Sequence, residues 1–204
     1  MIGILLAGGA ATRLPNKPLL PMRDLRPVCF SGMDYLLRHE VDHVAVVTPP
    51  SSVIVDVIDK VYGDKIDLDF IYQPEPTGVG DALNLVNRDG QSSLIVMADN
   101  VYPQGELLPT DSSYCWAVVR QVPAWRMPHL VRLGKHNHLT RTGPGTHALS
   151  TPWFLTEDCN EPISSEGWDH FSGLTPVIRP GDRWWDVGVP ETYAAYWRNG
   201  CKDR

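Results

Sequence analysis

One short stretch near the start of the chain constrains the fold more than any other. The apolar run Ile2–Ala7 ends abruptly in the pair Gly8-Gly9. A continuous apolar run is typical of a buried parallel strand, and paired glycines after it predict a tight loop. In open α/β sheets, ligands bind at the carboxyl ends of the strands, where backbone N–H groups can approach an anion closely. We therefore expect a ligand-binding loop directly after the first strand.

Two cations follow this glycine pair, and they favour a phosphate-rich ligand. Arg13 and Lys17 lie within five residues of each other. The phosphate loop of nucleotide triphosphatases is excluded, because it needs glycine where Arg13 stands and a Lys-Ser/Thr pair after it. The stretch Gly78-Val79-Gly80 begins like a dinucleotide fingerprint, but Leu83 stands where the third small residue belongs. Neither of these glycine motifs explains the loop.

The loop instead resembles the signature of the sugar-1-phosphate nucleotidylyltransferases. That signature reads Leu-Ala-Gly-Gly, two small residues, Thr-Arg-Leu and then Lys-Pro-Leu-Leu-Pro, and the chain carries it at residues 6–14 and 17–21. Two features depart from the pattern. Ala11 replaces a glycine that is common in the family, and only three residues separate Arg13 from Lys17, fewer than in the hexose-phosphate members. The short spacing is similar to relatives that build isoprenoid and molybdenum cofactors, so the acceptor stays open.

The resemblance implies a role for each part of this loop. Arg13 and Lys17 are the expected catalytic residues: Lys17 would hold the α-phosphate of a nucleotide, and Arg13 would hold the β- and γ-phosphates with the loop amides. The expected nucleotide-binding residues of the loop are Leu6, Ala7, Gly8, Gly9, Ala10, Ala11 and Thr12.

A second stretch, from Gln73 to Asp81, resembles the base-recognition segment of the same family. It follows a predicted strand over Leu68–Tyr72, and the Gln73 amide offers both a donor and an acceptor to a base edge. Read alone, the stretch also fits a proline- and glycine-rich turn before a helix over Gly80–Asn87. The resemblance implies that Gln73, Gly78 and Asp81 bind the nucleotide, with a weak preference for a pyrimidine base.

Two carboxylates complete the resemblance as a predicted metal site. Asp99 follows the apolar strand Ser93–Met97, where a carboxylate is costly to bury unless a cation or a capping role accounts for it. Asp186 lies in the stretch from Trp184 to Pro190, which resembles the second metal-ligand segment of the family, ahead of a helix. The resemblance implies that both aspartates share Mg²⁺, an ion that prefers oxygen ligands and bridges phosphate oxygens. In the alternative interpretation, Trp184 and Trp185 are core residues and Asp186 starts a helix.

The alternation of strands and helices predicts an α/β fold with a single domain. The resemblance implies a Rossmann-like, mainly parallel and doubly wound sheet with an antiparallel or hairpin insertion in the second half. We place the nucleotide-binding half at about 1–110 and the acceptor-binding half at about 111–204. The expected strands are Ile2–Ala7, Val44–Thr48, Leu68–Tyr72, Ser93–Met97, Tyr114–Val122 and Ala148–Leu155, with helices near Ser31–His39, around Val57 and over Gly80–Asn87, a hairpin over Leu130–Leu139 and a polar lid-like loop over Glu157–Glu166.

The acceptor site is the least defined part of the sequence. The Glu-Lys-Pro motif that holds the sugar phosphate in the family is missing, and Arg141 is the nearest candidate cation. A net charge of −6 argues against a general binder of nucleic acid or membrane surfaces. No stretch reaches the ~20 apolar residues that span a bilayer, and the four cysteines are scattered, so a cytoplasmic protein with reduced thiols is expected. Homo-oligomerisation stays open.

These features predict an enzyme that transfers a nucleoside monophosphate from a triphosphate to a phosphorylated acceptor, most often a sugar 1-phosphate. The products would be a nucleoside-diphosphate sugar and pyrophosphate. A phosphate monoester is largely dianionic at pH 7, so the chemistry needs cations and backbone donors rather than an activating His or Ser. Two alternatives stay open: a cytidylyl- or guanylyltransferase acting on an alcohol phosphate or a molybdenum-cofactor precursor, and a nucleotide-binding regulatory domain without activity.

Overall fold

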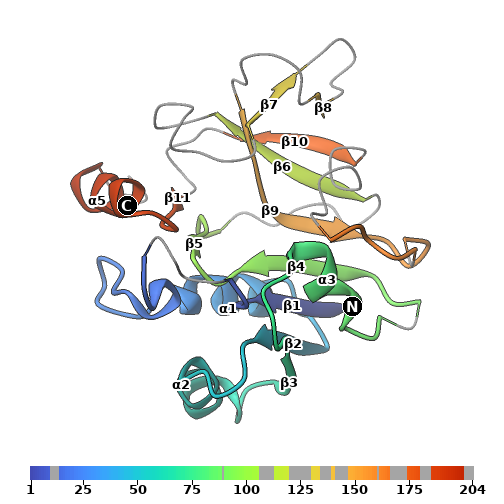
Figure 1. The fold of residues 1–204 in the computed structure, drawn as a ribbon, viewed down its shortest axis with the longest axis horizontal. Coiled ribbons are helices and arrows are strands. Elements are labelled where there is room, and N and C mark those ends of the chain that lie inside the picture. Colours follow the sequence, from blue (N-terminus) through green and yellow to red (C-terminus); the bar gives the residue numbers. More distant parts are fainter. Residues whose placement is uncertain are drawn as a thin grey trace.

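The structure is a computed structural model, and the part of the chain that it describes carries one large mixed sheet (Figure 1). Within this sheet of nine strands, the main order is β10-β6-β9-β4-β1-β2-β3. The described residues are 1–9, 14–88, 90–105, 113–119, 130–133, 139–140, 147–159, 161–165, 174–179 and 185–199.

The first half of the sheet is parallel, and the second half is mixed. Parallel pairing joins β4 to β1, β1 to β2 and β2 to β3. Strand β9 runs antiparallel to both β4 and β6, whereas β10 runs parallel to β6. The short strands β7 and β8 form a hairpin beside β9. The strands are β1 (Ile2–Leu6), β2 (His43–Thr48), β3 (Asp67–Tyr72), β4 (Ser93–Met97), β6 (Tyr114–Val119), β7 (Leu130–Leu133), β8 (Leu139–Thr140), β9 (His147–Leu155) and β10 (Thr175–Arg179).

Helices lie on both faces of the parallel half. Alternate residues of a strand point to opposite faces, so β1 sends Leu5 to one core and Ile4 to the other. Helices α1 (Cys29–Arg38) and α2 (Ile54–Tyr62) cover the Leu5 face. Helix α3 (Val79–Asn84) covers the Ile4 face through Ala82 and Leu83. The sheet is therefore covered from both sides, which explains why its central strands are apolar along their whole length.

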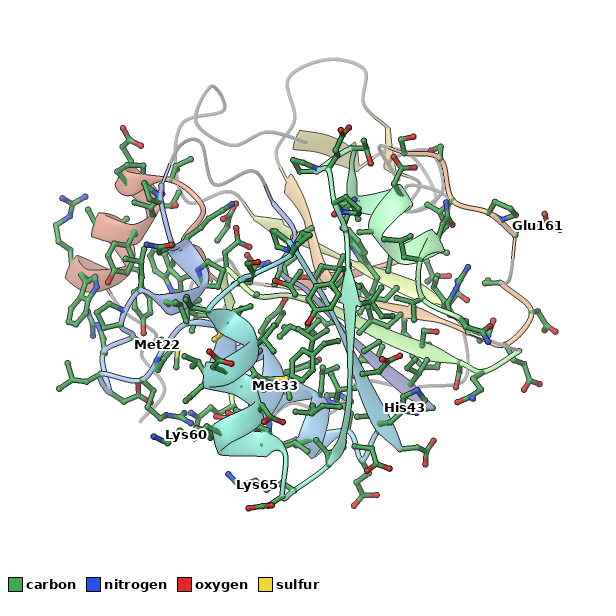
Figure 2. All side chains as sticks on the ribbon, turned by 60° about the horizontal axis from the view of Figure 1, so that its bottom comes forward. Met22, Met33, His43, Lys60, Lys65 and Glu161 are labelled. Atoms are coloured by element: carbon green, nitrogen blue, oxygen red, sulfur yellow. The ribbon has the colours of Figure 1, made fainter. Side chains whose placement is uncertain are left out.

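The core on the Leu5 face is closely packed. Met33 of α1 is fully buried there and lies behind α2 in Figure 2, whereas Lys60 and Lys65 point away from the sheet. The rings of Phe30 and Tyr62 meet edge to face at 5.2 Å between centroids, joining the two helices. The Tyr62 hydroxyl donates to Asp34, 2.7 Å away. Burial and this hydrogen bond raise the pKa of Tyr62 above its ordinary value.

The register of the parallel strands aligns their carboxyl ends. Leu6 pairs with both Val47 and Met97, and Thr48 pairs with Tyr72. The loops after β1, β3 and β4 therefore leave the sheet at one edge. In Figure 1, helix α5 (Pro190–Asn199) and the short strand β11 (Trp185–Asp186) lie beyond this edge, although they come from the other end of the chain.

The predicted fold class is confirmed, with local corrections. The expected strands and hairpin are present within one or two residues wherever the structure describes them, and α3 is shorter than expected. Strand β10 and the short strands β5 (Asn100–Val101) and β11 were not predicted. Among the helices that the structure describes, no candidate for a membrane span is found. The division into a nucleotide half and an acceptor half stays a prediction.

The packing of α1 generates a stability prediction. Leu36 is fully buried in this helix, whereas Leu25 is 78% exposed in the preceding loop. We expect Leu36→Ala to lower the free energy of unfolding by about 2–5 kcal/mol, because it removes buried methyl groups and leaves a cavity. The same change at Leu25 should stay within about 0.5 kcal/mol. Urea unfolding of both variants measures the difference, and equal losses would contradict the packing described.

Candidate functional site

The site is built where the carboxyl ends of the parallel strands meet. Gly8 and Gly9 follow β1, Gln73 follows β3 and Asp99 follows β4. Backbone hydrogen bonds continue the sheet beyond the strands, since Ala98 N donates to the Leu6 carbonyl at 2.9 Å and Gln73 N to the Thr48 carbonyl at 2.9 Å. These bonds hold the starts of three loops in a fixed relation, as expected for the ligand edge of an open α/β sheet.

An ion pair joins the loop after β1 to the loop after β4. Lys17 begins the short helix η1 (Lys17–Leu19), and its Nζ donates to Asp99 Oδ2 at 2.7 Å. Both side chains are largely screened from solvent, with exposed fractions of 16% and 17%. Water weakens such a pair less than it weakens a pair on the open surface. Lys17 also reaches back to the glycine loop, because a side chain on Gly9 would begin 3.8 Å from its Nζ.

Asp186 reaches the same place through a strand pairing between distant segments. Strand β11 pairs antiparallel with β5, which places Asp186 opposite Asn100. The Val187 N–H then donates to the backbone carbonyl of Asp99 at 3.0 Å. The two aspartates therefore belong to neighbouring backbone segments, and the pairing sets the distance between them.

Gly188 marks the point at which the charged groups converge. A Cβ atom built on it would lie 2.7 Å from Asp186 Oδ1, 3.2 Å from Asp99 Oδ2 and 3.6 Å from Lys17 Nζ. The Gly188 N–H donates to Asp186 Oδ1 at 2.6 Å, which fixes this carboxylate in a tight turn. Two carboxylates and one ammonium group therefore lie around this glycine.

A buried hydrogen-bond network supports the segment that carries Asp99. The Tyr102 hydroxyl accepts from the Met97 N–H at 2.7 Å and is hydrogen-bonded to the Thr151 hydroxyl. Asn100 Nδ2 donates to the same threonine at 3.0 Å, and the Tyr102 N–H donates to Ser31 Oγ at 2.8 Å. Burial raises the pKa of Tyr102, so this phenol stays protonated at neutral pH. Asp99 thus belongs to a segment that several buried hydrogen bonds hold in place.

The loop that carries Lys17 is held from the other side by helix α5. The Tyr193 hydroxyl donates to the Pro21 carbonyl at 2.9 Å, and the Arg23 N–H donates to the Tyr196 hydroxyl at 3.1 Å. The Arg23 guanidinium also donates to the Trp197 carbonyl at 2.6 Å. Because α5 follows the Asp186 segment directly, these bonds tie the lysine loop to the second aspartate.

Gln73 lies beside the glycine loop, as its predicted role requires. It is only 5% exposed, and its Nε2 donates to the Gly78 carbonyl at 3.3 Å. A Cβ on Gly8 would fall 2.5 Å from Gln73 Oε1. The amide therefore bridges the loop after β1 and the proline-rich turn after β3. Asp81 lies in the first turn of α3, beyond this turn, and nucleotide binding by both residues stays a prediction.

The described part of the expected lid-like loop is attached to helix α3. Asn84 Nδ2 donates to the Ile163 carbonyl at 2.7 Å, and the Ile163 N–H donates back to Asn84 Oδ1 at 3.0 Å. The Gly80 N–H donates to the Ser165 carbonyl at 2.9 Å. Ile163 is buried, whereas Glu161 points outward at the rim of the molecule (Figure 2). Residues 161–165 thus pack against α3 as part of the fold.

The structure brings together seven of the residues predicted for the site. Gly8, Gly9, Lys17, Gln73, Gly78, Asp99 and Asp186 lie around the edge described above, with Leu6 and Ala7 leading into it. The alternative interpretation of the Trp185-Asp186 pair is correct in one part and wrong in the other. Trp185 is a core residue, but Asp186 does not start a helix, because α5 begins at Pro190. Five predicted site residues lie outside the described residues: Ala10, Ala11, Thr12, Arg13 and Arg141. Trp184, the other core residue of the alternative interpretation, also lies outside them.

The chemistry of the two carboxylates fits Mg²⁺ in the presence of a phosphate ligand. Among the described residues, no group of three or more His, Cys, Asp and Glu side chains could hold a metal ion. Mg²⁺ seldom needs such a cage, since it commonly takes one or two carboxylates and completes its octahedron with phosphate oxygens and water. Asp99 and Asp186, both converging on Gly188, provide that minimal donor set.

Comparison with known sequences finds curated relatives over part of the chain. No protein-family model matches the chain. Over 113 residues, the chain is 28% identical to proteins named glucose-1-phosphate thymidylyltransferase from two strains of Xanthomonas campestris pv. campestris. The match covers 49% of this chain and 37% of each relative, so the chain matches little more than a third of the length of these curated relatives.

Solved structures share the fold over the whole chain. A protein from Bacillus anthracis described as a glucose-1-phosphate thymidylyltransferase, solved with sucrose, superposes with a TM-score of 0.74 at 14% identity and covers 100% of this chain and 97% of its own. HddC from Yersinia pseudotuberculosis reaches 0.67 at 19% identity, covering 100% and 99%. Its complex with GMP-PN reaches 0.67 at 18% identity, again covering 100% and 99%.

Two glycines provide a contrast between the site and the scaffold. A Cβ on Gly80 would lie 1.7 Å from the Ser164 carbonyl oxygen, so Gly80→Ala must displace backbone and should cost about 2 kcal/mol or more. A Cβ on Gly188 would meet mainly carboxylate oxygens at the ends of side chains, which can move. Gly188→Ala should therefore cost less than about 1 kcal/mol but displace Asp186. Thermal unfolding of both variants tests the order, and greater destabilisation by Gly188→Ala would contradict it.

Proposed function

We propose that this chain, which resembles the sugar-1-phosphate nucleotidylyltransferases in sequence and fold, transfers a nucleoside monophosphate from a triphosphate to a phosphorylated acceptor. The observation that carries the proposal is the convergence of Lys17, Asp99 and Asp186 beside the Gly8-Gly9 loop. A structural salt bridge would not need a second carboxylate, a glycine loop and a buried amide at the same edge. Together they suit a ligand that is rich in phosphate and carries a base.

The residues would act mainly by position and charge. The acceptor phosphate is already nucleophilic at pH 7, so its oxygen can attack the α-phosphorus directly while the bond to the β-phosphate oxygen breaks and pyrophosphate leaves. Lys17 would bind the α-phosphate, where charge develops in the transition state. The backbone N–H groups of Gly8 and Gly9 would hold the phosphates beside it. In this scheme, the protein groups orient the phosphates and neutralise their charge, and they transfer no proton.

Asp99 and Asp186 would hold Mg²⁺ in this proposal. The ion would neutralise phosphate charge and help to orient the reacting groups. The protein's own contribution is the fixed spacing of the two carboxylates, which the β5–β11 pairing and the Gly188 turn maintain. Arg13 and Arg141 keep their predicted roles toward the β- and γ-phosphates and toward the acceptor.

A sugar 1-phosphate is the acceptor that we favour, and a pyrimidine triphosphate is the favoured donor. The support is that the sequence relatives from Xanthomonas campestris are named glucose-1-phosphate thymidylyltransferase. A guanylyltransferase is the second candidate, because HddC shares the fold and was solved with GMP-PN and because the Arg13–Lys17 spacing is short. Use of a nucleoside triphosphate also favours the cytoplasmic location expected from the sequence. A regulatory domain without activity would not need both carboxylates.

A screen for pyrophosphate release tests the function directly. Purified protein would be incubated with each of UTP, dTTP, CTP, GTP and ATP against a panel of sugar 1-phosphates and alcohol phosphates, with Mg²⁺ or with EDTA. We expect one combination to release pyrophosphate, and EDTA to abolish the release. Lys17→Ala should keep its thermal midpoint and lose most turnover, by about 100-fold or more, because it removes charge from the reacting phosphate.

Lys60→Ala is the matched control for that variant. Lys60 is an exposed lysine in the last turn of α2, and its side chain points away from the sheet (Figure 2). Its turnover should equal that of the wild type. A Lys17→Ala protein with unchanged kcat/KM on the best substrates would remove Lys17 from the proposed machinery.

Gln73→Ala should change the choice of base more than the rate with the preferred base. Gln73 contacts Gly8 and Gly78 and would face the base, whereas Lys17, which pairs with Asp99, would face the reacting phosphate. Loss of one base-reading amide should relax discrimination by about 1–3 kcal/mol, or roughly 5- to 150-fold. Competition between triphosphates measures this, with the exposed Gln91→Ala as control. An unchanged preference profile in Gln73→Ala would count against Gln73 as the base reader.

A further inference from the structure

The ammonium group of Lys17 contacts the carboxylate that a divalent cation would need. Its Nζ lies 2.7 Å from Asp99 Oδ2, the oxygen that also lies 3.2 Å from the Gly188 Cβ position. Asp186 Oδ1 lies 2.7 Å from that same position. A cation shared by the two aspartates would therefore compete with Lys17 for Asp99.

The low exposure of Lys17 and Asp99 makes this competition with the cation costly. Lys17 and Asp99 are both largely screened from solvent, so separating them leaves two charges that water solvates poorly. A divalent ion bound to Asp99 would also place a second positive charge beside the Lys17 ammonium. Lys17 then needs a new anionic partner, and the Gly9 backbone is near, with its Cβ position 3.8 Å from Lys17 Nζ. A phosphate held by the glycine loop would supply that partner.

We propose that Lys17 is the counter-ion of Asp99 until nucleotide binds, so that the divalent cation enters this site only together with the nucleotide phosphates. The inference rests on the proposed function for the identity of the phosphate ligand. It adds an order of events that this function does not require: Lys17 exchanges Asp99 for phosphate as the cation takes Asp99. Coupling of this kind is reciprocal, so the cation and the nucleotide strengthen each other's binding.

The test measures cation affinity in the absence of nucleotide. Mn²⁺ serves as the probe, and its binding is followed by the loss of the electron paramagnetic resonance signal of the free ion. The test variant is Lys17→Met, which keeps an unbranched side chain of nearly the same length and removes its charge. Lys60→Met makes the same change on an exposed face of α2. We expect Lys17→Met to bind Mn²⁺ about ten-fold tighter or better than the wild type, and Lys60→Met to match the wild type.

Two further variants keep the result interpretable. Adding Asp186→Asn to Lys17→Met should reverse the gain, because the second carboxylate is lost; a gain that survives places the ion elsewhere and overturns the proposal. Lys17→Gln replaces Lys17→Met if thermal unfolding shows that the methionine variant is not folded. Mn²⁺ binding by Lys17→Met that equals that of the wild type, or is weaker, would also overturn the proposal. The absence of Mn²⁺ binding by both the wild type and Lys17→Met would do the same.

The result of the Mn²⁺ experiment can be distinguished from the result of the screen that tests the proposed function. Tighter Mn²⁺ binding in Lys17→Met without any pyrophosphate release in the screen would support the exchange and reject the transferase. Pyrophosphate release with unchanged Mn²⁺ affinity would support the transferase and reject the exchange.

Discussion

The pairing of two very short strands holds the candidate site together. Strands β5 and β11 contribute two residues each, yet their antiparallel register places Asp186 beside the segment that carries Asp99. One further backbone bond, from Val187 N to the Asp99 carbonyl, continues the pairing. Without this pairing, the position of the Asp186 carboxylate would depend on a loop alone. The buried network around Tyr102 and Thr151 gives the β5 side of the pairing a rigid base.

Bringing two carboxylates together creates an electrostatic problem that the fold must solve. Like charges in a partly dehydrated place repel, and each loses hydration. The structure answers with the Lys17 ammonium on Asp99 and the Gly188 N–H on Asp186. The same arrangement suits a ligand that carries both phosphate and a divalent cation, because each charged group of the protein then finds an opposite charge in the ligand.

Hydrogen bonds from other parts of the fold hold the loops of the site in place. Helix α5 holds the lysine loop through Tyr193 and Tyr196, and so connects the two charged loops by a second route. On the other face of the sheet, residues 161–165 are hydrogen-bonded to α3 through Asn84 and Gly80, next to the turn that carries Gly78. The turn that carries Gly78 and residues 161–165 are thus linked through the hydrogen bonds of α3.

Much of the fold and the chemistry of the site could be predicted from the sequence, because both are encoded locally. Apolar runs and helical periodicity place β1 to β4 and their helices, and the family resemblance of four separate stretches identifies Lys17, Gln73, Asp99 and Asp186 as candidates. Strand β10 escaped prediction because a five-residue strand containing Pro176 has little pattern of its own. The tertiary structure alone decided the β5–β11 pairing, the Lys17–Asp99 contact and the attachment of residues 161–165 to α3. These depend on contacts between distant positions, and two-residue strands or single hydrogen bonds leave no periodic signal in a sequence.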